Sequence, residues 1–184
     1  MSHLLDINGM AEKLIVLQHY AYGSKEYCRR LLIGSKHDAG DEMLNNYWGW
    51  TKGLVSNYLL ECSIGLRVFL DTVAIKLEPN EIEELDTKAR SGLAVGEVFL
   101  GSFELSVRES CNKIIHATKV STLWETENID DTDFKYWNGK VELQGTKGKK
   151  AWGLYLNVAD WAKSMEYMTD QIDDISSYVS HDWY

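Results

Sequence analysis

Three polar residues between positions 108 and 116 have the types and the spacing of a site that handles phosphate. Arg108, Asn112 and His116 follow one another at intervals of four residues, so on an α-helix they lie along one face. A guanidinium group can bind a phosphate through two hydrogen bonds, and an imidazole can act as a general acid or base near neutral pH. The spacing therefore makes Arg108, Asn112 and His116 candidate catalytic residues, with Asn112 orienting the reacting group.

The opposite face of the same segment is apolar, as a helix packed on a core requires. At 100° per residue, one arc collects Val107, Cys111, Ile114 and Ile115, which predicts an amphipathic helix from about residue 102 to 119. Eight residues of helix separate Arg108 from His116 by about 12 Å along the axis. We therefore expect a second copy, packed antiparallel, to bring Arg108 of one chain close to His116 of the other.

Lysines complete the candidate set as phosphate contacts for RNA. Lys119 shares the polar face of the predicted helix and Lys113 lies beside it. Three more lysines occur in a later glycine-rich turn: Lys147, Lys149 and Lys150. This turn is the one local basic patch in an acidic chain, and a basic patch attracts nucleic acid phosphates. The alternative is a solvated turn whose lysines serve solubility.

Composition limits the classes of protein that the chain can belong to. The length of 184 residues suits one domain, and the net charge of −9 disfavours a broad electrostatic grip on nucleic acid. Cys28, Cys62 and Cys111 form no C-x-x-C pair, which indicates buried free thiols in a reducing compartment, the cytoplasm. We find no signal peptide, no long apolar window and no metal-binding motif, so we expect no membrane span, no metal and no cofactor.

Helical periodicity dominates the chain. Apolar residues recur at helical spacing over 4–33, 41–77 and 157–179, and an acidic run at 81–90 predicts a short helix. The glycine-punctuated segment 92–101 fits neither period well, and we leave it unassigned.

Between the candidate catalytic helix and the last helix the apolar period changes to two. Aromatic and aliphatic residues alternate between 122 and 155, Asn138-Gly139 is a strong hairpin turn signal, and 145–148 forms a second one. The expected fold is therefore mainly α: an up-and-down bundle of four or more helices with a small antiparallel β-hairpin insertion before the last helix. We expect one domain over 1–184, with the insertion at 122–156.

The sequence N-K-I-I-H, from Asn112 to His116, lies on the third long helix of this acidic domain and resembles the HEPN superfamily. The stretch C-S-I-G-L-R-V-F-L-D in the preceding helix adds to the resemblance. It implies a helical domain that dimerises, and often a metal-independent endoribonuclease of a toxin–antitoxin or phage-defence system. Asn112 and His116 match the polar and histidine positions of the family motif. Cys111 stands where the family has arginine, and the nearest upstream arginine is Arg108.

The leading hypothesis is therefore a HEPN-like, metal-independent ribonuclease that forms a homodimer, acts on RNA and has an antitoxin or another defence protein as its partner. The first alternative is a non-catalytic domain that uses the same polar face to bind a nucleotide or a protein. A third hypothesis is a small-molecule pocket lined by Trp48, Trp50 and Trp152.

Overall fold

The chain folds as an α/β structure in which five helices pack with one antiparallel sheet. The computed structural model describes residues 6–34, 41–73 and 79–180. The helices are α1 (Ile7–Leu31), α2 (Glu42–Val73), α3 (Pro79–Ala89), α4 (Val107–Ile115) and α5 (Val158–Ser180). The strands are β1 (Gly96–Leu100), β2 (Lys119–Ile129), β3 (Thr132–Lys147) and β4 (Lys150–Asn157), in the sheet order β1-β4-β3-β2.

The prediction of a mainly α bundle with a small hairpin insertion was wrong. The region expected to be an insertion contains three long strands, and the unassigned segment supplies β1, which pairs with β4 at the edge of the sheet. The sheet is also part of the core, because Trp137 and Leu154 from its strands share one buried cluster with Leu14, Leu66 and Trp161 from the helices. The extent of a single domain over 1–184 stays a prediction.

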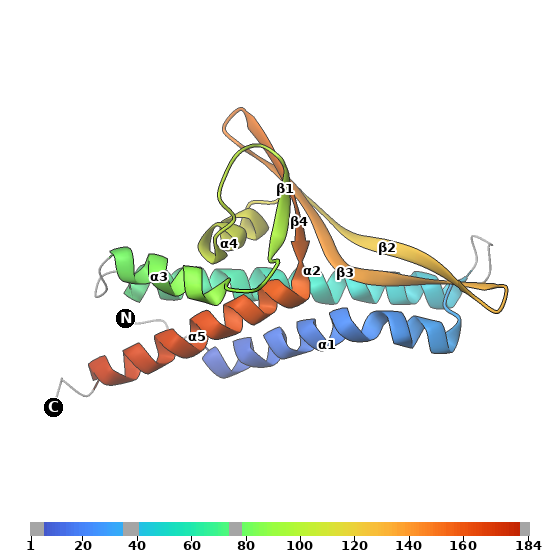
Figure 1. Cartoon of the computed structure of the whole chain (residues 1–184), viewed down its shortest axis with the longest axis horizontal. Coiled ribbons are helices and arrows are strands. Elements are labelled where there is room, and N and C mark those ends of the chain that lie inside the picture. The colour runs from blue at the N-terminus through green and yellow to red at the C-terminus, as the bar shows by residue number, and fades with distance from the viewer. Residues whose placement is uncertain (1–5, 35–40, 74–78, 181–184) are drawn as a thin grey trace.

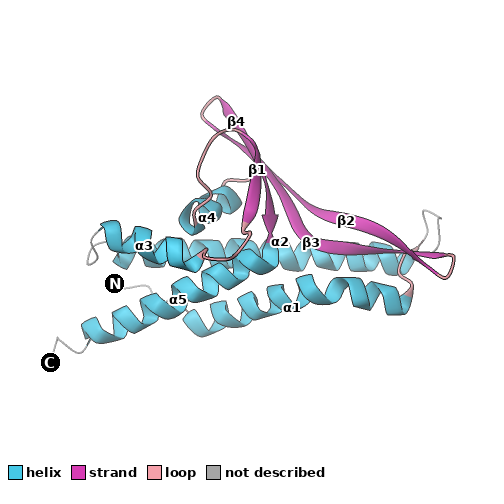
Figure 2. Cartoon of the chain, in the orientation of Figure 1, coloured by secondary structure: helices cyan, strands magenta, loops and turns pink. Residues whose placement is uncertain are grey.

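The molecule has a layer of long helices from which the sheet rises. In Figure 1, α1, α2 and α5 run along the long axis, the strands leave this layer on one side, and α4 lies beside them. Figure 2 shows the same arrangement with the strands in one colour. The three long helices agree closely with the predicted ranges, and α3 confirms the short acidic helix. The side chain of Asp6 caps α1 by accepting a hydrogen bond from the backbone nitrogen of Gly9.

The first hairpin turns eight residues earlier than the sequence predicts. Strands β2 and β3 are joined at Asp130 and Asp131, whose φ angles of 47° and 61° give the turn two left-handed residues. Asn138-Gly139 instead lies inside β3, where the register with β2 shifts. Gly139 has φ +80°, and a Cβ there would be 3.5 Å from Cβ of Ala21 in α1. Glycine at this position therefore permits a bulge close to a helix.

The buried residues of β3 keep the same parity across the bulge. Trp137 before it is buried, and so are Val141 and Leu143 after it. The bulge sets three residues of β3 against one of β2, and two extra residues leave the alternation of faces unchanged. Phe134 and Tyr136, which have the opposite parity, are buried in a separate cluster with Cys28, Ile33 and Tyr47.

Strands β3 and β4 continue past both of their neighbours as a two-stranded ribbon. Pairing of β2 with β3 ends at Gln144, and pairing of β1 with β4 ends at Gly153. The β3–β4 ladder goes on to Lys147 and Lys150, and the tip of this ribbon projects beyond the sheet in Figure 1.

Among the described residues, one helix meets the length and composition of a membrane span. The segment Glu42–Asp71 of α2 is 30 residues long, and 39% of its most apolar window is buried inside the protein. The sequence predicted no such window. Core helices of proteins that never enter a bilayer pass the same test, and α2 places Val55, Leu59 and Leu66 in the shared core.

Candidate functional site

Helix α4 is fixed to the rest of the protein at its N-terminus. The Ser106 side chain accepts a hydrogen bond from the backbone nitrogen of Glu109 at 3.0 Å. Asp86 on α3 accepts hydrogen bonds from the backbone nitrogens of Val107 and Arg108 at 2.6 and 3.4 Å. A carboxylate here satisfies amides that have no partner within the helix and complements the positive end of the helix dipole.

The helix is shorter than the sequence predicts. It ends at Ile115, and His116 is the C-cap residue, with its backbone nitrogen donating to the Asn112 oxygen. Two residues later the backbone nitrogen of Thr118 donates to the Gln144 oxygen at 2.8 Å, and β2 begins. His116 therefore lies at the junction between α4 and the sheet, and Lys119 lies on a strand.

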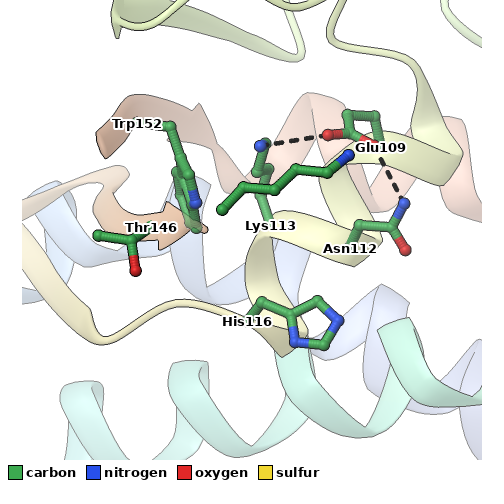
Figure 3. Close-up of a pocket in the computed structure, with 7 residues that line it drawn as sticks. Glu109, Asn112, Lys113, His116, Thr146 and Trp152 are labelled. Carbon is green, nitrogen blue, oxygen red and sulfur yellow. Dashed lines mark hydrogen bonds and ion pairs between the residues drawn. The ribbon is translucent and has the colours of Figure 1, made fainter. Parts of the chain in front are cut away.

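A pocket of about 470 Å³ lies between α4 and the β3–β4 ribbon. Figure 3 shows side chains of α4 on one wall, with Thr146 and Trp152 of the strands opposite. The lining residues are Glu109, Asn112, Lys113, His116, Thr146, Lys147 and Trp152. The structure thus brings together Asn112, Lys113, His116 and Lys147 from the predicted set. Glu109 and Thr146 were not predicted as site residues, and Trp152 was predicted only for the small-molecule pocket.

Lys113 is buried at the back of this pocket, with its side chain 8% exposed. Its Nζ lies 3.2 Å from Oε1 of Glu109, and it sits 4.1 and 4.6 Å from the ring centroids of Phe103 and Trp152. The carboxylate and the two ring faces together compensate for the removal of the ammonium group from water.

Glu109 also organises the rest of this wall, because its Oε2 accepts a hydrogen bond from the Asn112 amide at 3.0 Å. Burial alone would raise the pKa of the Glu109 carboxyl. The hydrogen bonds from Asn112 and Lys113 and the charges of Lys113 and Lys147 outweigh burial and lower this pKa. The pocket therefore holds two ammonium groups against one carboxylate, a locally positive site in a chain of net charge −9.

Glycine at position 145 allows the Trp152 ring to form the far wall. Gly145 and Trp152 are cross-strand partners. A Cβ at position 145 would lie 2.7 Å from Cε2 of Trp152 and 3.0 Å from the backbone oxygen of His116. A larger residue would therefore push the indole or the His116 backbone out of place.

We expect Gly145→Val to lower the stability of the protein by about 1–3 kcal/mol, because its side chain overfills a packed site. Thermal unfolding and the near-ultraviolet circular dichroism of the tryptophans would measure the change. Gly23→Ala is the control, because a Cβ at Gly23 meets nothing within 4 Å and alanine is the better helix former. An unchanged melting temperature for Gly145→Val would contradict this packing role.

Arg108 lies outside the pocket that contains His116. Its Nη2 is 2.7 Å from Oδ1 of Asp71 on α2, and the Arg108 and Asp71 side chains are 42% and 52% exposed. Asp71 also pairs with Arg67, as the i, i+4 spacing of the sequence suggests. Arg108 lines a different hollow, beside Asp86 and Arg90. Within one chain, the three-residue stripe predicted from spacing is therefore divided between two surfaces.

Other predicted positions are not among the residues that line the pocket. The Lys119 ammonium pairs with Glu142 at 2.8 Å, and Lys149 and Lys150 are exposed at the tip of the ribbon. Cys111, which occupies the family's arginine position, is fully buried 3.6 Å from the Met165 sulfur. Burial raises the pKa of the Cys111 thiol to about 12. All three cysteines are free and buried, which confirms the sequence expectation.

The three tryptophans of the small-molecule hypothesis lie at separate places. Trp152 is in the α4 pocket, whereas Lys52 covers the Trp48 ring at 5.3 Å. Trp50 lines a second hollow, of about 510 Å³, between α1 and α2. We call this the aromatic hollow; it is lined by His19, Tyr20, Gly23, Ser24, Tyr27, Tyr47 and Trp50.

Within the described parts of the chain, no group of three or more histidine, cysteine, aspartate or glutamate side chains is placed to hold a metal ion. Comparisons with protein-family models, curated proteins and solved structures found no match for this chain. The family resemblance therefore stays a prediction from the motif, and the residues of the pocket carry the proposed function.

Proposed function

We propose that the α4 pocket is a phosphodiester site and that the protein cleaves RNA without a metal ion. The observation that carries the proposal is the convergence of His116, Lys113 and Lys147 on one pocket from two different parts of the fold. A proton-transfer group beside two ammonium groups matches the needs of phosphoryl transfer, in which negative charge builds up on the phosphate oxygens.

The reaction starts with the proton of the ribose 2′-hydroxyl. The neutral His116 imidazole accepts this proton while the 2′-oxygen bonds to the adjacent phosphorus atom. The bond from phosphorus to the 5′-oxygen breaks, and the leaving oxygen keeps the electron pair and takes a proton from water. The hydroxide that this leaves takes the proton from the His116 imidazolium, which restores the neutral imidazole. The products are a 2′,3′-cyclic phosphate and a free 5′-hydroxyl, and nothing is oxidised or reduced.

The lysines have separate tasks in this scheme. Lys147 is exposed at the end of β3, so its ammonium can meet a phosphate directly. Lys113 is held in place by Glu109 and two rings, so its charge is fixed before substrate arrives, and a fixed charge costs no reorganisation during the reaction. The Thr146 hydroxyl on the same wall can donate a hydrogen bond to a phosphate oxygen.

We expect the purified protein to cleave single-stranded RNA in the presence of EDTA and to leave the corresponding DNA intact, because DNA lacks the 2′-hydroxyl. Mass spectrometry of the fragments would identify 2′,3′-cyclic phosphate and 5′-hydroxyl ends. Fragments with 5′-phosphate ends, or cleavage that stops when EDTA is added, would contradict the mechanism.

One observation favours a second candidate, a nucleotide-binding domain without catalysis. The Lys113 ammonium already has a carboxylate partner, and the Arg108 guanidinium faces another hollow. Such a domain would bind nucleotides in the α4 pocket and leave RNA uncleaved, and calorimetric titration beside the cleavage assay separates the two. The toxin or defence role, the antitoxin partner and the cytoplasmic location stay predictions from the sequence.

A further inference from the structure

The aromatic hollow between α1 and α2 is larger than the α4 pocket, at about 510 Å³ against about 470 Å³, and the proposed ribonuclease activity gives it no task. Both volumes fall in the range of small-molecule sites. Four of the seven lining residues are tyrosine or tryptophan, and none is aspartate, glutamate, lysine or arginine. A ligand of this hollow is therefore held by contacts with aromatic rings and not by ion pairs with carboxylates, ammonium groups or guanidinium groups.

Three tyrosine rings follow one another along the wall of the hollow. The Tyr47 ring on α2 has its centroid 5.8 Å from that of Tyr20 and 5.4 Å from that of Tyr27, both on α1. The interplanar angles are 36° and 30°, so the rings are closer to parallel than to edge-on. A cage for a cation surrounds it with ring faces on several sides, whereas a row of nearly parallel rings is extended by another flat ring. The row therefore favours a planar ligand.

The inner part of this wall is already fixed without a ligand. Tyr47 is 5% exposed, and its hydroxyl donates a hydrogen bond to Oγ of Ser24 at 2.9 Å. The Ser24 oxygen also accepts a hydrogen bond from the backbone nitrogen of Trp137 at 3.1 Å. A wall that is ordered in advance loses little conformational freedom when a ligand binds. Tyr27 and Trp50 are 49% and 67% exposed, so their rings stay accessible from solvent.

Gly23 leaves space at the α1 side of the hollow. It lies in the interior of α1, where glycine weakens the helix relative to alanine. A Cβ at this position would meet nothing within 4 Å, so packing within the described chain does not require glycine here. Because Gly23 lines the hollow, the volume that its side chain would occupy belongs to the hollow. A long side chain at position 23 would fill that volume.

A purine base has the shape and the chemistry that this lining accepts. Bases are flat and uncharged, and proteins bind unpaired bases by stacking them on tyrosine and tryptophan rings. The two fused rings of a purine match the indole of Trp50 in size, so a purine gains more contact area than a pyrimidine does. Because the described lining contains no lysine or arginine, the ribose and any phosphate are expected to remain outside the hollow.

We propose that the aromatic hollow is a binding site for purine bases, in which the base lies over Gly23 and stacks on the accessible rings of Tyr27 and Trp50. The base belongs either to a free nucleoside or to an unpaired position of a nucleic acid strand, and the recognition chemistry is the same for both. The proposal does not rest on the ribonuclease activity, because a different set of residues lines the α4 pocket.

Isothermal titration calorimetry of the full chain with adenosine tests the proposal, because adenosine has no phosphate for the lysines of the α4 pocket. We expect saturable binding that does not weaken as the salt concentration is raised, since no counterions are displaced. AMP should bind as tightly as adenosine, and uridine should bind more weakly. Absence of binding at millimolar adenosine would overturn the proposal. Binding of tetramethylammonium without binding of adenosine would also overturn it, because the hollow would then be a cation cage.

Trp50→Ala is expected to weaken adenosine binding by about 5- to 150-fold, the usual effect of removing one ring that stacks on a base. Trp48→Ala is the matched control. Trp48 lies on the same helix and is 46% exposed, but it does not line the hollow, so this variant should bind adenosine as the parent does. Equal affinities of the two variants would contradict the proposed site.

Gly23→Leu is the sharper variant, because leucine meets open space in the chain, favours the helix and fills the hollow. We expect a folded protein that melts no lower than the parent and no longer binds adenosine. Gly49→Leu is its matched control, since Gly49 is also a glycine inside a helix with nothing within 4 Å of its Cβ, and it does not line the hollow. A Gly23→Leu protein that binds adenosine like the parent would refute the assignment.

A short single-stranded oligodeoxyadenylate distinguishes the two sources of the base, and it resists the proposed cleavage because it lacks the 2′-hydroxyl. If it binds more tightly than adenosine, and Gly23→Leu removes the difference, the source is a nucleic acid strand; equal affinities assign the hollow to free nucleosides. Lys147→Ala should leave adenosine binding unchanged. Loss of adenosine binding in Lys147→Ala but not in Trp50→Ala would place the base in the α4 pocket and overturn the proposal, whereas absence of RNA cleavage alone would refute only the ribonuclease.

Discussion

Replacing His116 with alanine is expected to slow RNA cleavage by about 10²–10⁴-fold, the usual contribution of a positioned general acid or base. His116 is exposed at the end of α4, and its cap hydrogen bond is made by the backbone. The substitution should therefore leave the melting temperature close to that of the parent. Initial cleavage rates on a fluorescent RNA, with both proteins at equal concentration, provide the measurement.

His19→Ala is the matched control, because it removes another imidazole but lies in the aromatic hollow between α1 and α2. Its cleavage rate should equal that of the parent. If His116→Ala cleaved RNA as fast as His19→Ala, the imidazole would have no catalytic part, and the nucleotide-binding alternative would be preferred.

Replacing Asp86 with alanine is expected to lower the free energy of unfolding by about 3 kcal/mol, as removal of one member of a buried charge network typically does. Asp86 is 7% exposed. One carboxylate oxygen accepts hydrogen bonds from the backbone amides at the start of α4. The other lies 2.7 Å from Nε of Arg90. The substitution removes both interactions and leaves the Arg90 guanidinium without its buried partner. Urea unfolding followed by circular dichroism would measure the loss.

Asp71→Ala provides the comparison for this prediction. The Asp71 carboxylate pairs with Arg108 and Arg67 at an exposed position, where an ion pair contributes at most about 1 kcal/mol. Equal losses for the two aspartates would show that Asp86 does not anchor α4. With the N-terminus of α4 released, the Asp86→Ala protein should also lose activity, because α4 positions Asn112 and Lys113.

The long helices could be predicted from the sequence because their signals are local. Periodic apolar residues and flanking breakers define α1, α2 and α5 to within a few residues. The alternation between 122 and 155 indicated antiparallel strands, but the complete sheet could not be predicted, because β1 pairs with β4 across a long stretch of chain. The strongest local turn signal, Asn138-Gly139, lies in a β-bulge inside β3. The turn between β2 and β3 is instead formed by two aspartates with positive φ.

In the candidate site, too, the contacts between residues close in sequence could be predicted and those between distant segments could not. Asn112, Lys113 and His116 are close in sequence, and the helical pattern placed them together. Thr146 and Trp152 join them through the β3–β4 hairpin, whose turn the sequence indicates near 145–148, but no local pattern shows that this hairpin lies against α4. The spacing of four residues places Arg108 on the same helical face as Asn112 and His116. Its guanidinium, however, pairs with Asp71 near the end of α2 and lies on another surface. The predicted helix through Lys119 failed because the Thr118 backbone bonds to Gln144 of β3 instead of continuing the helix.

The two-stranded ribbon gives the α4 pocket walls of unequal stiffness. The α4 wall is anchored by Asp86 and packed on the core, whereas Thr146 and Lys147 lie where neither β2 nor β1 pairs with the ribbon. A ladder with unpaired outer edges opens at lower free energy than the centre of a sheet. The pocket therefore has one rigid wall, formed by α4, and one deformable wall, formed by the ribbon. Its width can adjust to the size of the bound group.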